Sequence, residues 1–407
     1  MKKYFDGETH KGFYAFLSSR LLLRVVSGLL GVFGQIFIYK IAGESIVGVL
    51  WFVALGSLLL LTLLPVGMKV VNKIGFIKAL QWSSIIAALY HLFYFLTDAF
   101  SIPFVWFVVG AALLLTVYKI LYWIPFHTEF FKLSDSKNRG RQVSFFEATS
   151  LLMSIFLPAV AAYLISRYGY PVVFIIAVIV MIASVFPYRK LKGMDRDDSF
   201  TWGYKRTWKM LYKERNTKMA FSFYAVGIES VINLFIWPIF LYQIFNGNLL
   251  DVGIVSTLII GATVLLQLLA GKYLDAFHKG SKVLKVGSIM YSLGWFAKIF
   301  IVTAVDVFIA GAYHAFSRIA TLTPMGSMHY DLSSQQEEYI DEYNVLREMY
   351  ISIGRIVAVI IAIILLNFVG IKWLFVIGAL SSLAFNFTSS EDMLLKEKRK
   401  QKICMID

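Results

Sequence analysis

About a dozen long apolar stretches follow one another along this chain of 407 residues, and short polar segments separate them. A bilayer core about 30 Å thick is crossed by about 20 apolar residues in an α-helix. Because lipid offers no hydrogen-bond partners, only helices and closed barrels satisfy their own backbone there. The runs are continuous and do not alternate every second residue, which favours helices over a barrel. The sequence therefore predicts an all-α polytopic membrane protein.

The composition agrees with this prediction. The chain is 58% hydrophobic and only 16% charged, whereas a soluble domain is about 25% charged. We expect twelve transmembrane helices, with both termini in the cytoplasm. Their expected ranges are 14–39, 45–66, 76–97, 102–126, 143–166, 171–187, 217–245, 251–270, 284–304, 306–329, 346–367 and 371–389.

The distribution of positive charge predicts this orientation. Most of the 39 Lys and Arg residues fall in the two termini and in alternate loops, and the opposite loops hold only Lys40, Arg167 and Lys372. Positive residues stay on the cytoplasmic side, in a cell membrane, and also contact anionic lipid headgroups. The net charge of +14 is therefore a topology signal and does not indicate a nucleic-acid partner. The acidic segment 331–342 interrupts the pattern, and topology gives no reason for it.

Several classes of site are excluded by the sequence. Cys404 is the single cysteine, so we expect neither an internal disulfide nor a cysteine metal cluster. No His, Asp and Glu residues have metal-ligand spacing. No Gly-x4-Gly-Lys-Ser/Thr stretch is present, so ATP is not expected to drive the protein directly. We expect no metal and no cofactor.

A polar segment divides the chain into two similar halves. Trp202, Trp208 and Tyr212 recur at helical spacing among Lys and Arg in this segment, which predicts an amphipathic helix in the cytoplasmic interface. A disordered linker is the alternative. The expected parts are a six-helix bundle at 1–188, a linker at 189–216, a second six-helix bundle at 217–390 and a basic tail at 391–407.

Residues on the two sides of the linker recur in the same order. The matched pairs are Phe37 and Phe240, Tyr39 and Tyr242, Pro125 and Pro324, Glu147 and Glu348, Gly169 and Gly370, and Phe174 and Phe375. Because six spans return the chain to its starting side, the two halves would be parallel repeats. Transporters built from such repeats bind their substrate between the halves, near the membrane midplane.

Loop motifs give this plan a family resemblance. Residues 271–275 are Gly-Lys-Tyr-Leu-Asp, followed by Gly280, and residues 72–75 are Asn-Lys-Ile-Gly. Both resemble the glycine, Asp-Arg and Gly loop signature of the major facilitator superfamily. Residues 138–141, Asn-Arg-Gly-Arg, are similar to the Arg-Gly-Arg before helix five of many members. The resemblance implies that helices one, four, seven and ten line a central cavity, with helix eleven close by. We expect a monomer.

Ionisable residues inside the expected spans predict a polar site, because a charge in hydrocarbon normally faces a cavity or a partner. Glu229, Arg318 and Arg355 lie about 15–18 Å along helices seven, ten and eleven, near one plane. Asn233 follows Glu229 by four residues and His314 precedes Arg318 by four, so each pair shares a helix face. Two guanidinium groups suit a carboxylate or a phosphate.

Three further residues are expected at this site: Gln35 and Tyr39 of helix one and Lys119 of helix four. For Lys119, in the cytoplasmic third of its helix, the alternative is that the side chain snorkels to the interface. Glu229 would either neutralise an arginine in the empty site or exchange the coupling proton. The alternative is a static ion pair that locks helices seven and ten together. Lys298 is expected to reach the outer interface from the end of helix nine.

Charged residues near the cytoplasmic helix ends predict a gate. Asp275 and Asn72 would accept hydrogen bonds from the free backbone donors that begin helices five and eleven. The alternative is that these loops only turn tightly and set the topology. The expected gate residues are Asn72, Lys73, Gly75, Arg141, Glu147, Gly271, Asp275, Gly280, Arg347 and Glu348.

The sequence thus predicts a secondary transporter rather than an enzyme. Its expected cargo is a small organic anion or zwitterion, with protons as the candidate coupling ion and membrane lipids as surroundings. A lipid, amphiphile or drug exporter of the same fold is the first alternative, although Trp106 stands about where proton-coupled exporters of the superfamily carry an arginine. A membrane-embedded enzyme and a transporter-like receptor are more remote alternatives.

Overall fold

The computed structural model describes residues 11–133, 149–150, 152–191, 200–215, 217–276, 280–335 and 340–387. The expected gate residues Arg141 and Glu147, the side chain of Asp275 and the expected tail at 391–407 lie outside the described residues. Within the described ranges the chain is helical and contains no strand. We call the described residues up to Leu191 the first half and those from Thr217 the second half.

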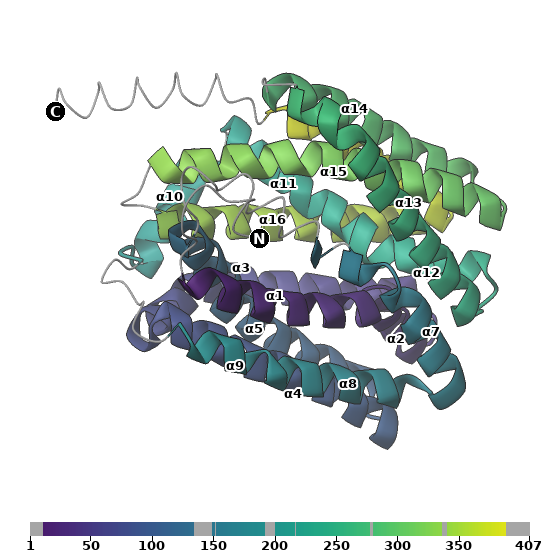
Figure 1. Ribbon diagram of the computed structural model, residues 1–407, viewed down its shortest axis with the longest axis horizontal. Helices are drawn as coiled ribbons and strands as arrows, with labels where there is room; N and C mark the ends of the chain where they lie inside the picture. The colour runs from purple at the N-terminus through teal and green to yellow at the C-terminus, as the bar shows by residue number, and fades with distance from the viewer. Residues whose placement is uncertain are drawn as a thin grey trace.

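The described helices follow one another in the order shown in Figure 1. They are α1 (Lys11–Leu30), α2 (Phe33–Ile41), α3 (Ile46–Ile74), α4 (Phe76–Phe100), α5 (Phe104–Leu133), α7 (Leu157–Tyr168), α8 (Tyr170–Ala183), α9 (Val185–Arg189), α10 (Tyr204–Glu214), α11 (Lys218–Val231), the π-helix η1 (Ile232–Ile236), α12 (Trp237–Ile244), α13 (Leu249–Ala276), α14 (Gly280–Ala297), η2 (Lys298–Phe300), α15 (Ala304–Gln335), α16 (Ile340–Leu366), η4 (Ile371–Leu374), α17 (Phe375–Ala384) and η5 (Phe385–Phe387).

Nine helical stretches in the described ranges are long and apolar enough to cross a bilayer. Two shorter apolar stretches, Leu152–Tyr168 and Ile371–Phe387, stand where the fifth and twelfth spans are expected. Helix α15, with 32 residues, covers the expected tenth span. The prediction of an all-helical, multi-pass membrane protein is confirmed.

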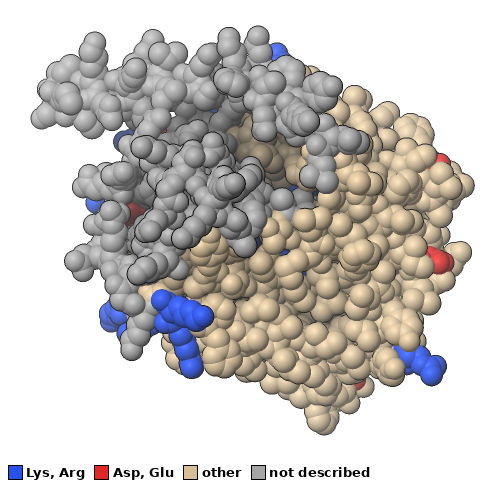
Figure 2. Space-filling view, viewed as in Figure 1, with Lys and Arg blue, Asp and Glu red and all other residues tan. Residues whose placement is uncertain are grey.

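The surface of the molecule fits a bilayer. Large apolar side chains such as Trp51, Leu258 and Ile360 are exposed on the helices. Figure 2 shows a broad face with few charged groups, and most of the Lys and Arg visible on it gather toward the end where α10 lies. An apolar belt with basic residues at one end is the distribution expected for a protein embedded in lipid.

The first spans of the two halves are interrupted at matching positions. Span one breaks between α1 and α2 at Gly31 and Val32, which lie six and five residues before Phe37. The positions six and five residues before Phe240 fall inside the π-helix η1. Gly31 weakens the helix through its backbone freedom, and a π-helix opens the regular hydrogen-bond ladder. The interruptions give each of these spans two segments that need not share one axis.

Matched aromatic residues also meet in the same way in both halves. The rings of Phe37 and Phe174 lie 5.0 Å apart at 77°, and the rings of Phe240 and Phe375 lie 5.2 Å apart at 90°. All four side chains are buried. Edge-to-face packing of this kind is the favoured geometry for aromatic pairs. The repeated sequence positions therefore have the same packing role.

The two halves lie side by side, the first in the lower part of Figure 1 and the second in the upper part. Helix α3 packs along α16, and α7 packs along α13. The backbone N–H of Ala159 in α7 donates to Thr257 Oγ1 of α13 at 3.0 Å. Each half thus offers two helices to the boundary between them.

Candidate functional site

A buried polar cluster lies inside the second half. The Glu229 side chain of α11 is 2% exposed, and the hydroxyl of Tyr291 in α14 donates to its Oε1 atom. Arg318 of α15 interacts electrostatically with both residues. The structure therefore brings Glu229 and Arg318 together, and it adds a tyrosine that sequence reasoning missed.

Lys298 belongs to the same cluster. Its Nζ atom lies 3.0 Å from His314 Nδ1 and stands over the rings of Trp237 and Trp295 at 3.7 and 4.2 Å. The side chain is only 1% exposed, so the expectation that it reaches the outer interface is wrong. Two indole faces and an imidazole nitrogen stabilise the ammonium group in the interior instead.

The sequence contains a pattern that indicates which residues of helix nine join the cluster. Tyr291, Trp295 and Lys298 are spaced by four and then three positions, so they share one face of helix nine. His314 packs against that face, with its ring 4.7 Å from Tyr291 and 4.2 Å from Trp295. Its Nε2 atom is buried and has no hydrogen-bond partner among the described residues. The cluster thus consists of two short polar contacts, Tyr291 with Glu229 and Lys298 with His314, joined by the packing of the Tyr291 and His314 rings.

A second polar group lies between the halves. Lys119 of α5 interacts electrostatically with Arg355 and Glu348 of α16. Arg355 donates from Nε to Ser230 Oγ of α11 at 3.1 Å, whereas its Nη1 atom is buried and has no acceptor among the described residues. Two cations and one carboxylate are thus close enough to influence one another electrostatically, and one guanidinium nitrogen among them has no acceptor among the described residues. We call Lys119, Arg355 and Glu348 the central group.

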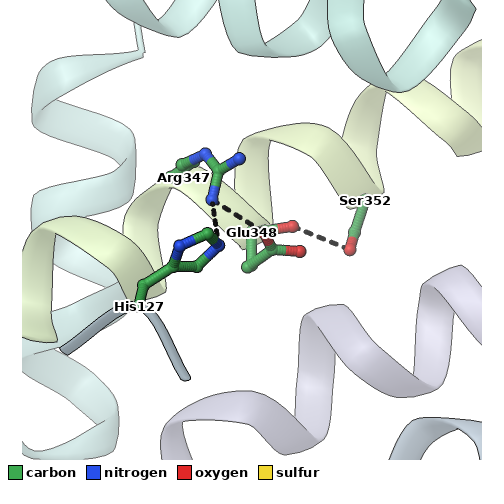
Figure 3. A network of polar contacts seen from close by, with 4 residues as sticks. All are labelled: His127, Arg347, Glu348 and Ser352. Carbon is green, nitrogen blue, oxygen red and sulfur yellow. Dashed lines mark hydrogen bonds and ion pairs between the residues drawn. The ribbon is translucent and has the colours of Figure 1, made fainter. Parts of the chain in front are cut away.

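The central group continues into a polar network that joins α5 to α16, shown in Figure 3. Arg347 Nη1 lies 3.4 Å from His127 Nε2 of α5 and 3.4 Å from Glu348 Oε1. Ser352 Oγ donates to the backbone carbonyl of Glu348 at 2.8 Å. Glu348 thus pairs with Arg347 of its own helix and also interacts electrostatically with Lys119 of the other half. Sequence reasoning missed His127.

Two residues of the acidic segment join the two halves near the linker. Asp341 and Glu342 are buried at the start of α16. Thr128 of α5 donates to Asp341 Oδ1 at 2.6 Å, and both the backbone N–H and the hydroxyl of Thr201 donate to Glu342 Oε1 at 2.7 Å. These carboxylates are acceptors for the first half and the linker, which explains why acidic residues occur on the basic side.

Two expected gate positions have surroundings other than those expected. Asn72 Nδ2 donates to the carbonyl of Phe200 in the linker at 2.8 Å, and its Oδ1 atom has no hydrogen-bond partner among the described residues, so it does not accept from the start of α16. Gly271 and Asp275 lie within α13, which extends to Ala276, and not in a loop, while the contact expected between Asp275 and helix five lies outside the described residues. Gly75 does make the tight turn before α4, with φ at 83°, and Gly280 is the first residue of α14. Lys73 is exposed.

The remaining expected site residues occupy other places. Tyr39 of α2 accepts from Gln243 Nε2 at 3.0 Å, so it joins the C-terminal ends of α2 and α12 and does not belong to the central group. Asn233 lies in η1 and is half-buried. Gln35 Oε1 is buried and has no hydrogen-bond partner among the described residues. No three His, Cys, Asp or Glu residues in the described ranges are placed to hold a metal ion.

Comparisons with known proteins add no further assignment. No protein-family model matches the chain, and a search of curated proteins finds no match.

Proposed function

We propose that this protein is a secondary transporter that moves a small organic anion or zwitterion across the cell membrane by alternating access. The observation that carries the proposal is the central group: Lys119 of one half faces the charge of Arg355 from the other half, and Arg355 Nη1 has no acceptor among the described residues. Buried donors without acceptors are rare in proteins. A carboxylate or phosphate bound between these cations would supply the acceptor.

The fold supports the proposal. The pairing of α3 with α16 and of α7 with α13 exchanges equivalent spans of two repeats, the second with the eleventh and the fifth with the eighth. This is the arrangement expected of twelve spans in two parallel six-helix bundles, as in the major facilitator superfamily, with both termini cytoplasmic. Rocking the bundles about the boundary would open the central group to one side at a time.

Protons are the proposed coupling ion. Glu229 is buried beside Tyr291 and Arg318, and Lys298 and His314 extend the cluster toward the outer side. A carboxyl group inside a transporter bundle is a typical proton relay. We expect Glu229→Gln to abolish the response of uptake to a pH gradient while substrate counterflow persists. A pH response equal to that of the unaltered protein would refute this role.

Transport in proteoliposomes tests the proposal. Arg355→Ala should lower the exchange of labelled organic anions about tenfold or more, because a charge-assisted bond is lost, and Arg355→Lys should retain part of it. Lys78→Gln, which alters an exposed lysine outside the expected site and gate, is the matched control and should leave exchange unchanged. Exchange unaffected by Arg355→Ala would remove the central group from the pathway. Uptake of labelled lysolipid instead of soluble anions would favour an exporter.

A further inference from the structure

The linker helix α10 carries three stripes along its length. Thr207 and Leu211 are buried and recur after four residues, so they form one line on the helix. Two more lines with the same spacing lie beside it, one aromatic and one basic. The aromatic line is Tyr204, Trp208 and Tyr212, and the basic line is Lys205, Lys209 and Lys213.

The basic stripe and the two ends of the aromatic stripe face outward, whereas Trp208 between them is half-buried. Lys205, Lys209 and Lys213 are exposed, Tyr204 is 42% exposed and Tyr212 is 67% exposed. Arg206 is exposed next to the basic stripe, and Glu214 is the single acidic residue of the helix. A line of cations beside amphipathic rings matches the surface of an anionic bilayer, where phosphates accept from the cations and rings sit at the headgroup level.

The buried stripe ties α10 to both halves. The hydroxyl of Tyr350 in α16 donates to the carbonyl of Leu211 at 3.1 Å, and α10 also packs against α3. The segment just before the helix adds the bonds from Asn72 to Phe200 and from Thr201 to Glu342. Helices α3 and α16 come from opposite halves, so the segment 200–215 is a strap across the boundary at its cytoplasmic end.

We propose that the exposed face of this strap binds anionic lipid headgroups, and that the lipid composition of the cytoplasmic leaflet thereby sets how firmly α3 and α16 are held together. Each cation near an anionic membrane surface strengthens association about fivefold. The attraction falls off within a Debye length, so salt weakens it. The inference does not depend on the proposed transport, because it concerns the contact between the strap and the bilayer.

Amide hydrogen exchange of the full-length protein in lipid nanodiscs tests the proposal. Exchange of the α10 amides should be about tenfold slower when phosphatidylglycerol is mixed into phosphatidylcholine than in phosphatidylcholine alone. High salt should remove most of the difference. Equal exchange rates in the two membranes would overturn the proposal.

Charge variants decide whether α10 itself provides the contact. Replacing Lys205, Arg206, Lys209 and Lys213 with Gln should abolish the lipid dependence, and replacing the three lysines with Arg should preserve it. The matched control replaces Lys69, Lys73 and Lys78 with Gln, because these exposed lysines lie on α3 and α4. This control should keep the lipid dependence of the α10 amides. Lipid dependence that survives the α10 variant, or disappears in the control, would overturn the proposal.

Discussion

The two halves share a packing scaffold but differ in what surrounds it. In the first half, the edge-to-face pair of Phe37 and Phe174 is covered by Tyr94, whose ring lies 5.6 and 5.3 Å from the two. In the second half, the ring of Trp295 lies 5.7 Å from Phe375 and also contacts Lys298 and His314. The same aromatic pair therefore lies beside a tyrosine in one half and beside a tryptophan that contacts a charged cluster in the other.

The difference extends to matched positions along the helices. Glu229 lies eleven residues before Phe240, and the position eleven residues before Phe37 is Val26, which is buried. One repeat thus has a charged side chain at the position where the other has an apolar side chain. A buried charge normally requires a partner or a function, and Glu229 has partners in Tyr291 and Arg318 of its own half.

The cations at matched positions of the two halves have partners in different halves. Lys119 lies six residues before Pro125, and Arg318 lies six residues before Pro324. Arg318 interacts with Glu229 of its own half, whereas Lys119 interacts with Glu348 of the other half. Motion between the halves would leave the first contact intact and change the second. Lys119 is therefore the matched cation whose surroundings depend on the relative position of the halves.

We expect the largest loss of stability when a ring of the matched aromatic pairs is removed. Phe174→Ala and Phe375→Ala should each lower the free energy of unfolding by about 3–5 kcal/mol, because both remove a fully buried ring. Denaturant unfolding in detergent micelles measures the two values. Losses that differ by more than about 2 kcal/mol would show that the matched positions do not play the same packing role.

The charged cluster predicts an effect confined to the second half. Glu229→Ala should lower the free energy of unfolding by about 3 kcal/mol, because it leaves Arg318 and Lys298 without their carboxylate. Val26→Ala, at the matched position, should cost about 1–2 kcal/mol from lost apolar burial. Glu229→Gln keeps an acceptor for Tyr291 and should fall between them. If Glu229→Ala is no more costly than Val26→Ala, the cluster does not stabilise the bundle, and the same unfolding assay decides this.

We expect the smallest changes in stability, with opposite signs, when two glycines are replaced by alanine. A Cβ atom on Gly227 of α11 would collide with the carbonyl of Ile351 in α16, whereas one on Gly56 of α3 would meet nothing within 4 Å. Gly227→Ala should therefore destabilise the protein by about 2 kcal/mol. Gly56→Ala should stabilise it by about 0.5–1 kcal/mol through helix propensity. Thermal unfolding measures both, and a stabilising Gly227→Ala would contradict the close approach of α11 and α16.

The helices were predictable because apolar length alone identifies a membrane span. The burial of Glu229 and its nearness to Arg318 also followed from depth along the helices. The burial of the Lys298 side chain could not be predicted from the sequence, because a lysine near a helix end can reach water or turn toward aromatic rings. Only the positions of Trp237 and Trp295 decide between these outcomes. Asn72 was misjudged for a similar reason, since an amide both donates and accepts and its neighbour determines which it does.

By itself the sequence determined that the chain is a multi-pass helical membrane protein with matched residues in two halves, because spans and repeats are written in local apolar patterns. Only the tertiary structure decided which charges meet. Lys119 and Glu348 are far apart in the chain and interact electrostatically across the boundary, and Tyr291 donates to Glu229 from another helix. Such pairings depend on how helices pack, and packing is fixed by the shapes of many side chains at once rather than by any single segment.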